Sequence, residues 1–132
     1  MTRPRRIIKT ARGYEPALSE EDVLGQIRCL LEANGARVFR VVERIPWGRT
    51  RSDGGIPDLF GWWPEDCLDC MEHNNRAIHF FIEVKKPGGK LRPAQVAWIE
   101  AAQRDGVIAF KAESVEEMVS EFRKYGIEVK GL

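Results

Sequence analysis

Two acids and a lysine stand where the sequence predicts strands to begin or end. Asp58 follows the glycine-rich segment 54–57, and Glu83 and Lys85 close an apolar run that starts at Ala77. Because successive side chains of a strand alternate between its two faces, Glu83 and Lys85 leave the strand on the same face. Taken alone, the pair is better explained by a simple ion pair on a half-exposed face.

Carboxylates beside a lysine suit the hydrolysis of a phosphodiester. Two carboxylates that meet form a hard-oxygen site for Mg²⁺ or Mn²⁺. The reaction needs an activated water, charge neutralisation on the phosphate and help for the leaving oxygen, which a divalent cation supplies. Lys85 would orient the water or stabilise the developing charge. This chemistry requires Asp58 to reach Glu83, which strand geometry alone does not decide.

The hydrophobic pattern predicts the elements that position these side chains. Apolar residues at helical spacing, with Ser19 and Asp22 as a capping box, predict helices over 19–34, 93–105 and 114–125. Strands are predicted at 37–43, 58–63, 77–85 and 107–110, with 127–129 as a candidate edge strand and 46–57 as a mobile loop. The order α-β-β-β-α-β-α predicts an α/β fold with a mixed sheet flanked by helices.

Length and composition indicate an ordinary globular protein. A chain of 132 residues, 43% apolar and 31% charged, suits one domain with one core. No segment approaches the ~18 apolar residues of a membrane span, so we expect no membrane partner. Three cysteines argue against a disulfide framework and favour a reducing, cytoplasmic setting.

Basic residues gather in two segments although the net charge is only +1. Residues 1–14 carry no acid, and residues 36–52 carry five arginines against Glu43 alone. This distribution suits a face turned to a polyanion, but a basic tail and a solvated loop explain it equally well. We therefore separate a basic arm, 1–18, from a domain at 19–132. The candidates for phosphate contacts are Arg40, Arg44, Arg49, Arg51, Lys86 and Lys90.

Cysteine and tryptophan supply further candidates. Cys67, Cys70 and His73 have the spacing of soft metal ligands, but structural zinc needs four ligands and no second Cys-x-x-Cys exists. The sequence thus favours a loop insertion over a zinc site. Cys29 is expected to fill space in the core. Trp62 is expected to pack, and Trp63 is left open between packing and stacking on bases.

Three segments carry a resemblance to a known family. They are Gly55-Ile56-Pro57-Asp58-Leu59, the run from Phe81 through Glu83-Val84-Lys85-Lys86-Pro87-Gly88-Gly89-Lys90-Leu91, and Pro93-Ala94-Gln95-Val96-Ala97-Trp98-Ile99. Together they resemble the VRR-NUC family of the PD-(D/E)xK nuclease superfamily, over about residues 19–122. Pro-Asp with Glu-x-Lys downstream is common by itself. The glycine before Pro-Asp, the Lys-Pro-Gly-Gly-Lys-Leu turn and the helix glutamine make the resemblance specific.

The resemblance implies a restriction-endonuclease-like core and roles for particular residues. Asp58, Glu83 and Val84 would hold Mg²⁺ or Mn²⁺, and Lys85 would be the catalytic lysine. Gln95 would support the lysine or contact the water or the phosphate.

The family also has an acid in its first helix, for which Glu20 and Glu21 are candidates. We prefer Glu20, which lines up with the core-facing stripe of that helix. However, the helix dipole favours acids in a first turn whatever their role.

The resemblance also implies a substrate and an assembly. Stand-alone, phage-like members are similar in size, and some act as homodimers on DNA junctions. We therefore expect an endonuclease that cuts branched, flapped or junction DNA. The alternatives are a nucleic-acid-binding module without catalysis and a zinc-stabilised interaction domain.

Overall fold

The computed structural model of the chain describes residues 7–10, 13–41, 44–45, 49–50, 55–64 and 77–131. Within these ranges the helices are α1 (Glu20–Ala33), α2 (Pro93–Arg104) and α3 (Val115–Lys124). The strands are β1 (Ile7–Thr10), β2 (Gly13–Pro16), β3 (Arg37–Arg40), β4 (Arg44–Ile45), β5 (Arg49–Thr50), β6 (Leu59–Trp63), β7 (Ile78–Val84) and β8 (Ile108–Ala112).

A four-stranded sheet in the order β3-β6-β7-β8 forms the centre of the fold. β6 pairs antiparallel with both β3 and β7, whereas β7 and β8 are parallel. A parallel pair needs a crossover connection, and α2 provides it. The predicted mixed sheet, with the strand of Glu83 in its middle, is confirmed.

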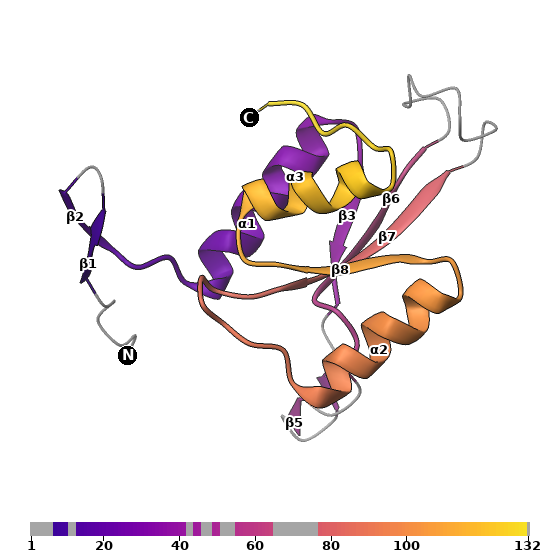
Figure 1. The fold of residues 1–132 in the computed structure, drawn as a ribbon, viewed down its shortest axis with the longest axis horizontal. Helices are drawn as coiled ribbons and strands as arrows, with labels where there is room; N and C mark the ends of the chain where they lie inside the picture. Colours follow the sequence, from indigo (N-terminus) through magenta and orange to yellow (C-terminus); the bar gives the residue numbers. More distant parts are fainter. Residues whose placement is uncertain are drawn as a thin grey trace.

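Helices cover both faces of this sheet (Figure 1). α1 and α3 pack against each other on one face, and α2 lies on the other. Strand alternation explains the division. Phe80, Ile82 and Val84 of β7 are buried in the main core with α1 and α3, while Phe81 points the other way and contacts Trp98 of α2. None of the described helices is long and apolar enough to cross a membrane.

The first helix begins and ends as its sequence predicts. Ser19 Oγ accepts the Asp22 N–H at 3.1 Å, and Asp22 Oδ2 accepts the Ser19 N–H at 3.0 Å, so the capping box is confirmed. Val23, Ile27 and Leu31 face the core. This packing sets the rotation of α1 about its axis, and it therefore decides which acid of the first turn faces the end of the sheet.

Three predictions about strands and loops need correction. The strand expected at 37–43 ends at Arg40, where the Val41 N–H bonds to the Asp58 carbonyl at 2.7 Å. The expected loop at 46–57 contains β5, which pairs antiparallel with β4. The tail at 127–129 is not a strand. Its Lys130 N–H and carbonyl bond instead to the side chain of Asn34, at 2.8 and 2.7 Å, while Ile127 and Val129 are buried in the core.

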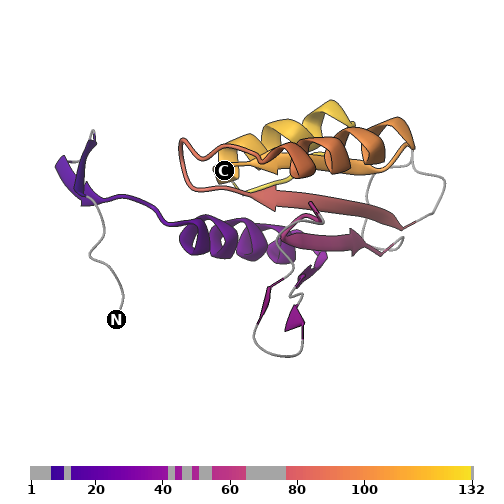
Figure 2. The ribbon, with the colours of Figure 1, turned by 90° about the horizontal axis from the view of Figure 1, so that it is seen from below.

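The basic N-terminal arm contains a hairpin. β1 and β2 pair antiparallel over Ile7–Thr10 and Gly13–Pro16. Figures 1 and 2 both show this hairpin apart from the central sheet, joined to α1 by an extended segment.

Cysteine and tryptophan also depart from expectation. Cys29 is exposed on α1, so the prediction that it fills the core is wrong, because it lies off the stripe formed by Val23 and Ile27. Trp63 is the tryptophan that fills the core, with its indole N–H bonded to the Asn34 carbonyl at 3.1 Å. Trp62 lies on the opposite face of β6 and is half-buried.

Candidate active site

The start of β6 and the end of β7 meet at one end of the sheet. Leu59 pairs with Ile82, which brings Asp58, just before β6, to the level of Glu83. Asp58 Oδ2 accepts the Val84 N–H at 3.1 Å. The Asp58 carboxylate is therefore held against the strand that carries Glu83, although 25 residues separate them in the chain.

Three carboxylates gather at this end of the sheet. Oxygens of Glu20, Asp58 and Glu83 lie within 4.8 Å of one another, and they come from three different elements: the first turn of α1, the start of β6 and the end of β7. Glu21 does not join them. Its carboxylate instead accepts hydrogen bonds from the two terminal nitrogens of the Arg40 guanidinium, one of them at 3.1 Å. Of the two first-helix candidates, Glu20 is the one beside Asp58 and Glu83.

Glu83 is the most buried member of the cluster, with 2% of its surface exposed. Its Oε1 accepts a hydrogen bond from Gln95 Nε2 at 2.8 Å and lies 3.4 Å from Lys85 Nζ. Among the described residues, Oε2 has no hydrogen-bond partner. A buried carboxylate oxygen without a partner is costly, and a cation ligated by it removes that cost. Three carboxylates, one of which carries this oxygen, fit a hard divalent cation such as Mg²⁺ or Mn²⁺.

The electrostatics of the cluster point the same way. Burial, together with the nearby Asp58 carboxylate, raises the pKa of Glu83 to about 8, while Lys85 opposes the shift. Partial burial likewise raises the pKa of Glu20, with Asp58 and Glu21 adding to the effect and Lys85 and Lys86 opposing it. Without a cation, the surroundings thus do not stabilise full ionisation of the three carboxylates, and Glu83 keeps its proton up to about pH 8.

Gln95 connects the cluster to α2. Its Oε1 accepts the Arg92 N–H at 2.8 Å, which caps the start of the helix, and its Nε2 donates to Glu83. The side chain is 4% exposed, so both ends of the amide are used inside the protein. The geometry therefore gives Gln95 a direct contact with Glu83. Glu83 in turn contacts Lys85, so Gln95 reaches the lysine only through Glu83.

Gly55 lets the loop before Asp58 lie directly on α2. Its φ of +67° is unfavourable for residues with a side chain, and a Cβ there would lie 2.3 Å from the Ala94 carbonyl oxygen and 3.1 Å from the Gln95 nitrogen. This close approach gives the glycine before Pro-Asp a physical reason. It allows the segment that ends at Asp58 to pack against the helix turn that carries Gln95.

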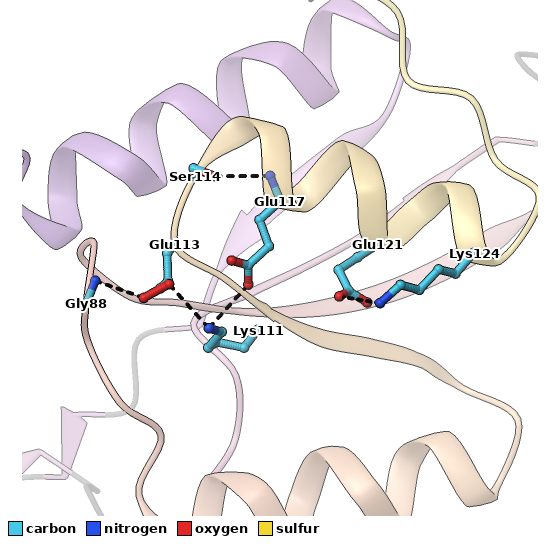
Figure 3. Close-up of polar contacts among 7 residues, drawn as sticks. All are labelled: Gly88, Lys111, Glu113, Ser114, Glu117, Glu121 and Lys124. Carbon is cyan, nitrogen blue, oxygen red and sulfur yellow. Dashed lines mark hydrogen bonds and ion pairs between the residues drawn. The ribbon is translucent and has the colours of Figure 1, made fainter. Parts of the chain in front are cut away.

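A second network holds the turn that follows Lys85 (Figure 3). Glu113, just after β8, accepts the Gly88 N–H at 2.9 Å. Lys111 Nζ lies 3.5 Å from Glu113 and 3.3 Å from Glu117, whose own N–H bonds to Ser114 Oγ at 3.0 Å. Sequence reasoning missed Glu113, because its partner is a backbone amide 25 residues away and no local pattern signals such a bond.

The predicted phosphate contacts are only partly described. The side chain of Arg40 is paired with Glu21, and Lys86 and Lys90 are exposed on and after the turn that follows β7. Arg44 and Arg49 lie in β4 and β5, but their side chains fall outside the description. Four of the candidate site residues named from the sequence lie wholly outside the described ranges: Arg51, Cys67, Cys70 and His73.

Carboxylates gathered beside a lysine at the end of a mixed sheet could hold a divalent cation of the kind that metal-assisted hydrolysis uses. The model of the VRR-NUC domain matches residues 14–116 of the 132-residue chain. The chain therefore belongs to the VRR-NUC family, a branch of the PD-(D/E)xK superfamily, and is a nuclease domain. No curated protein matches it significantly.

Proposed function

We propose that this nuclease domain is an endonuclease that hydrolyses DNA phosphodiester bonds with Mg²⁺ or Mn²⁺. The observation that carries the proposal is the cluster of Glu20, Asp58 and Glu83 oxygens within 4.8 Å of one another, beside Lys85. Asp58 and Glu83 would hold the cation, with the Val84 carbonyl and Glu20 as further ligands. A cation bound there supplies charge neutralisation for the phosphate and an acidified water.

We expect Lys85 to act on the reacting groups. Its side chain is 13% exposed, and its Nζ lies 3.4 Å from Glu83 Oε1, so the ammonium sits at the edge of the carboxylate cluster. A compact cation in that position orients the attacking water or stabilises the charge that develops on the phosphate. Gln95 keeps Glu83 in place during this step through its 2.8 Å hydrogen bond.

We expect this enzyme to select its substrate by the structure of the DNA and not by its base sequence. A domain of 132 residues has little surface for reading bases, which makes sequence-specific cutting by this domain the weaker proposal. Exposed Lys86 and Lys90 follow the catalytic strand and carry positive charge suited to phosphates. We therefore propose branched, flapped or junction DNA as substrate, cut by a single chain or by a homodimer.

A cleavage panel tests the proposal. Linear duplex, single-stranded, flapped and four-way DNA are incubated with the protein and Mg²⁺, Mn²⁺ or EDTA. We expect metal-dependent cutting that Lys85→Ala lowers by about 10²–10³-fold while DNA binding persists. Lys90→Ala is the matched control, because it removes an exposed lysine of the same region and should weaken binding without abolishing the chemistry.

The same panel distinguishes a nuclease from the alternative, a nucleic-acid-binding module without catalysis. If the protein binds these DNAs and leaves all of them intact with each metal, it is a nucleic-acid-binding module without catalysis. If cutting persists unchanged in Lys85→Ala, the proposed role of this lysine is wrong. Light scattering of the free protein and of its complex with DNA measures whether one chain or two is bound.

A further inference from the structure

Aromatic side chains cover part of the sheet face that carries the acidic cluster. Phe39, Phe60 and Phe81 stand opposite one another across β3, β6 and β7. The Phe39 ring stacks on Phe60 with a centroid distance of 5.4 Å and an angle of 24°, and on Trp62 at 5.2 Å and 23°. We call Phe39, Phe60 and Trp62 the aromatic face.

The aromatic face remains open to solvent beside α2. Phe81, the next ring across the sheet, is met by Trp98 of α2 at 5.0 Å, so the helix covers the β7 side. On the β3 side, Phe39 is 41% exposed, and Phe60 and Trp62 are half-buried. Folded proteins rarely leave adjacent large aromatic rings in water, and such a patch marks a binding surface.

The aromatic face continues directly from the acidic cluster. Phe60 and Trp62 lie two and four residues beyond Asp58, so they share its side of β6. Phe81 precedes Glu83 by two residues on the same side of β7. At about 3.3 Å per residue, Phe60 and Trp62 lie roughly 7 and 13 Å along the strand from Asp58. A chain that leaves the cluster along this face therefore meets the rings one after another.

The charge around the aromatic face fits a polyanion. Arg37 of β3 is exposed and stands opposite Trp62, which also faces the exposed His79 of β7. The sequences of β3 and β6, RVFR and LFGWW, contain no acid. A flat aromatic surface next to positive charge is how proteins hold single-stranded nucleic acid, since every base has a face that stacks.

We propose that the aromatic face stacks on unpaired bases of the DNA strand that enters the candidate active site. The proposal rests on the proposed nuclease function and deepens it, because it names unpaired nucleotides beside the cut as the feature that is recognised. Arg37 contacts the phosphates of the same strand, and the rings of Phe39 and Trp62 contact its bases.

An abasic strand separates stacking from attraction between charges. Binding is measured in EDTA, by fluorescence anisotropy, with labelled oligo-dT of about 20 nucleotides and with an abasic strand of equal length and charge. We expect Phe39→Leu and Trp62→Leu to lower the affinity for oligo-dT about tenfold each and to leave the abasic strand unaffected. Leucine retains the apolar contact, and a thermal melt confirms that each variant is folded.

Tyr125 supplies the matched control, because it is an aromatic residue with a similar exposure of 36% at the end of α3. Tyr125→Leu should change neither affinity. The proposal is overturned if Phe39→Leu weakens both strands equally, if it weakens neither, or if it merely dissociates a dimer in light scattering. Binding that depends on bases without any cutting would refute the nuclease proposal alone, and cutting without an effect of Phe39→Leu would refute the stacking proposal alone.

Discussion

Gln95 Nε2 donates a 2.8 Å hydrogen bond to Glu83 Oε1, and both side chains are almost fully buried. The other end of the same amide accepts the Arg92 N–H at 2.8 Å. One side chain thus joins the first turn of α2 to the end of β7. The orientation of the Glu83 carboxylate, and with it the charge presented to a cation, depends on where α2 begins.

Gln95→Ala should weaken metal binding. Loss of the bond leaves Glu83 free to rotate, and removal of such a supporting residue typically costs about 10–100-fold in metal affinity or activity. The measurement is Mn²⁺ titration by calorimetry. Gln103→Ala is the control. The Gln103 side chain of α2 also donates a hydrogen bond, at 2.7 Å to the carbonyl of the buried Ala109, but away from the cluster. Equal losses in both variants would show that Gln95 acts on general stability alone.

Glu83 should make the metal-free protein less stable as pH rises. Burial raises its pKa to about 8 from 4.5, so the folded state holds a proton that the unfolded state has released between these values. The stability that neutral Glu83 contributes is present below about pH 4.5 and is lost as pH rises through about 8. Glu83→Gln cannot ionise. In EDTA we expect the melting temperature of the native protein to fall relative to that of Glu83→Gln across this range, and parallel pH profiles would contradict the assignment.

Gly55→Ala should displace the first turn of α2 and lower activity. The new Cβ would lie 2.3 Å from the Ala94 carbonyl oxygen in addition to the strain of a φ of +67°. Gly106→Ala isolates the strain of a positive φ from the steric clash, because Gly106 has a φ of +84° with no atom within 4 Å of its Cβ position. We expect Gly106→Ala to cost about 1 kcal/mol and Gly55→Ala distinctly more, measured by urea unfolding. Equal costs would mean that the loop yields without moving α2.

Glu113→Ala should loosen the turn after Lys85 without touching the chemistry. The variant removes the acceptor of the Gly88 N–H and one partner of Lys111 (Figure 3). We expect a several-fold higher KM for DNA with kcat nearly unchanged, because Lys86 in this turn is exposed and is one of the proposed phosphate contacts. Glu121→Ala is the control, since it breaks an ion pair with Lys124 within α3, away from the turn after Lys85. A fall in kcat with KM unchanged would contradict this role.

Glu21→Gln should strengthen DNA binding by freeing Arg40. In the folded protein Glu21 accepts hydrogen bonds from the two terminal nitrogens of the Arg40 guanidinium, and this pairing competes with a phosphate. A freed arginine adds one phosphate contact, so the plot of log affinity against log salt should steepen by about 1. Glu32→Gln breaks a comparable pair with Arg28 farther along α1 and should leave the slope unchanged. If Arg40→Ala in the Glu21→Gln background has no effect, Arg40 does not contact DNA.

Local patterns were enough to place most of the fold. Caps and apolar spacing predicted α1, α2 and α3 within one or two residues, because helix ends depend on neighbours in the sequence. The apolar run ending at Glu83 correctly indicated the middle of the sheet. The tail at 127–129 was predicted wrongly, because the hydrogen bonds beside it go to a distant partner, Asn34. The β4–β5 pair was missed because it joins only two residues of each strand, too few to give a strand pattern in the sequence.

The candidate site divides in the same way. The sequence alone determined that Glu83 and Lys85 share a face, since strand alternation is local, and it nominated Asp58 as their partner. The family resemblance nominated Gln95 and a first-helix acid. Only the tertiary structure decided that Glu20 rather than Glu21 meets Asp58 and Glu83, and that Gln95 binds Glu83 directly. Strand register, the rotation of α1 on the core and the close approach of Gly55 to α2 are packing outcomes. They depend on contacts between segments far apart in the chain, which residue spacing does not encode.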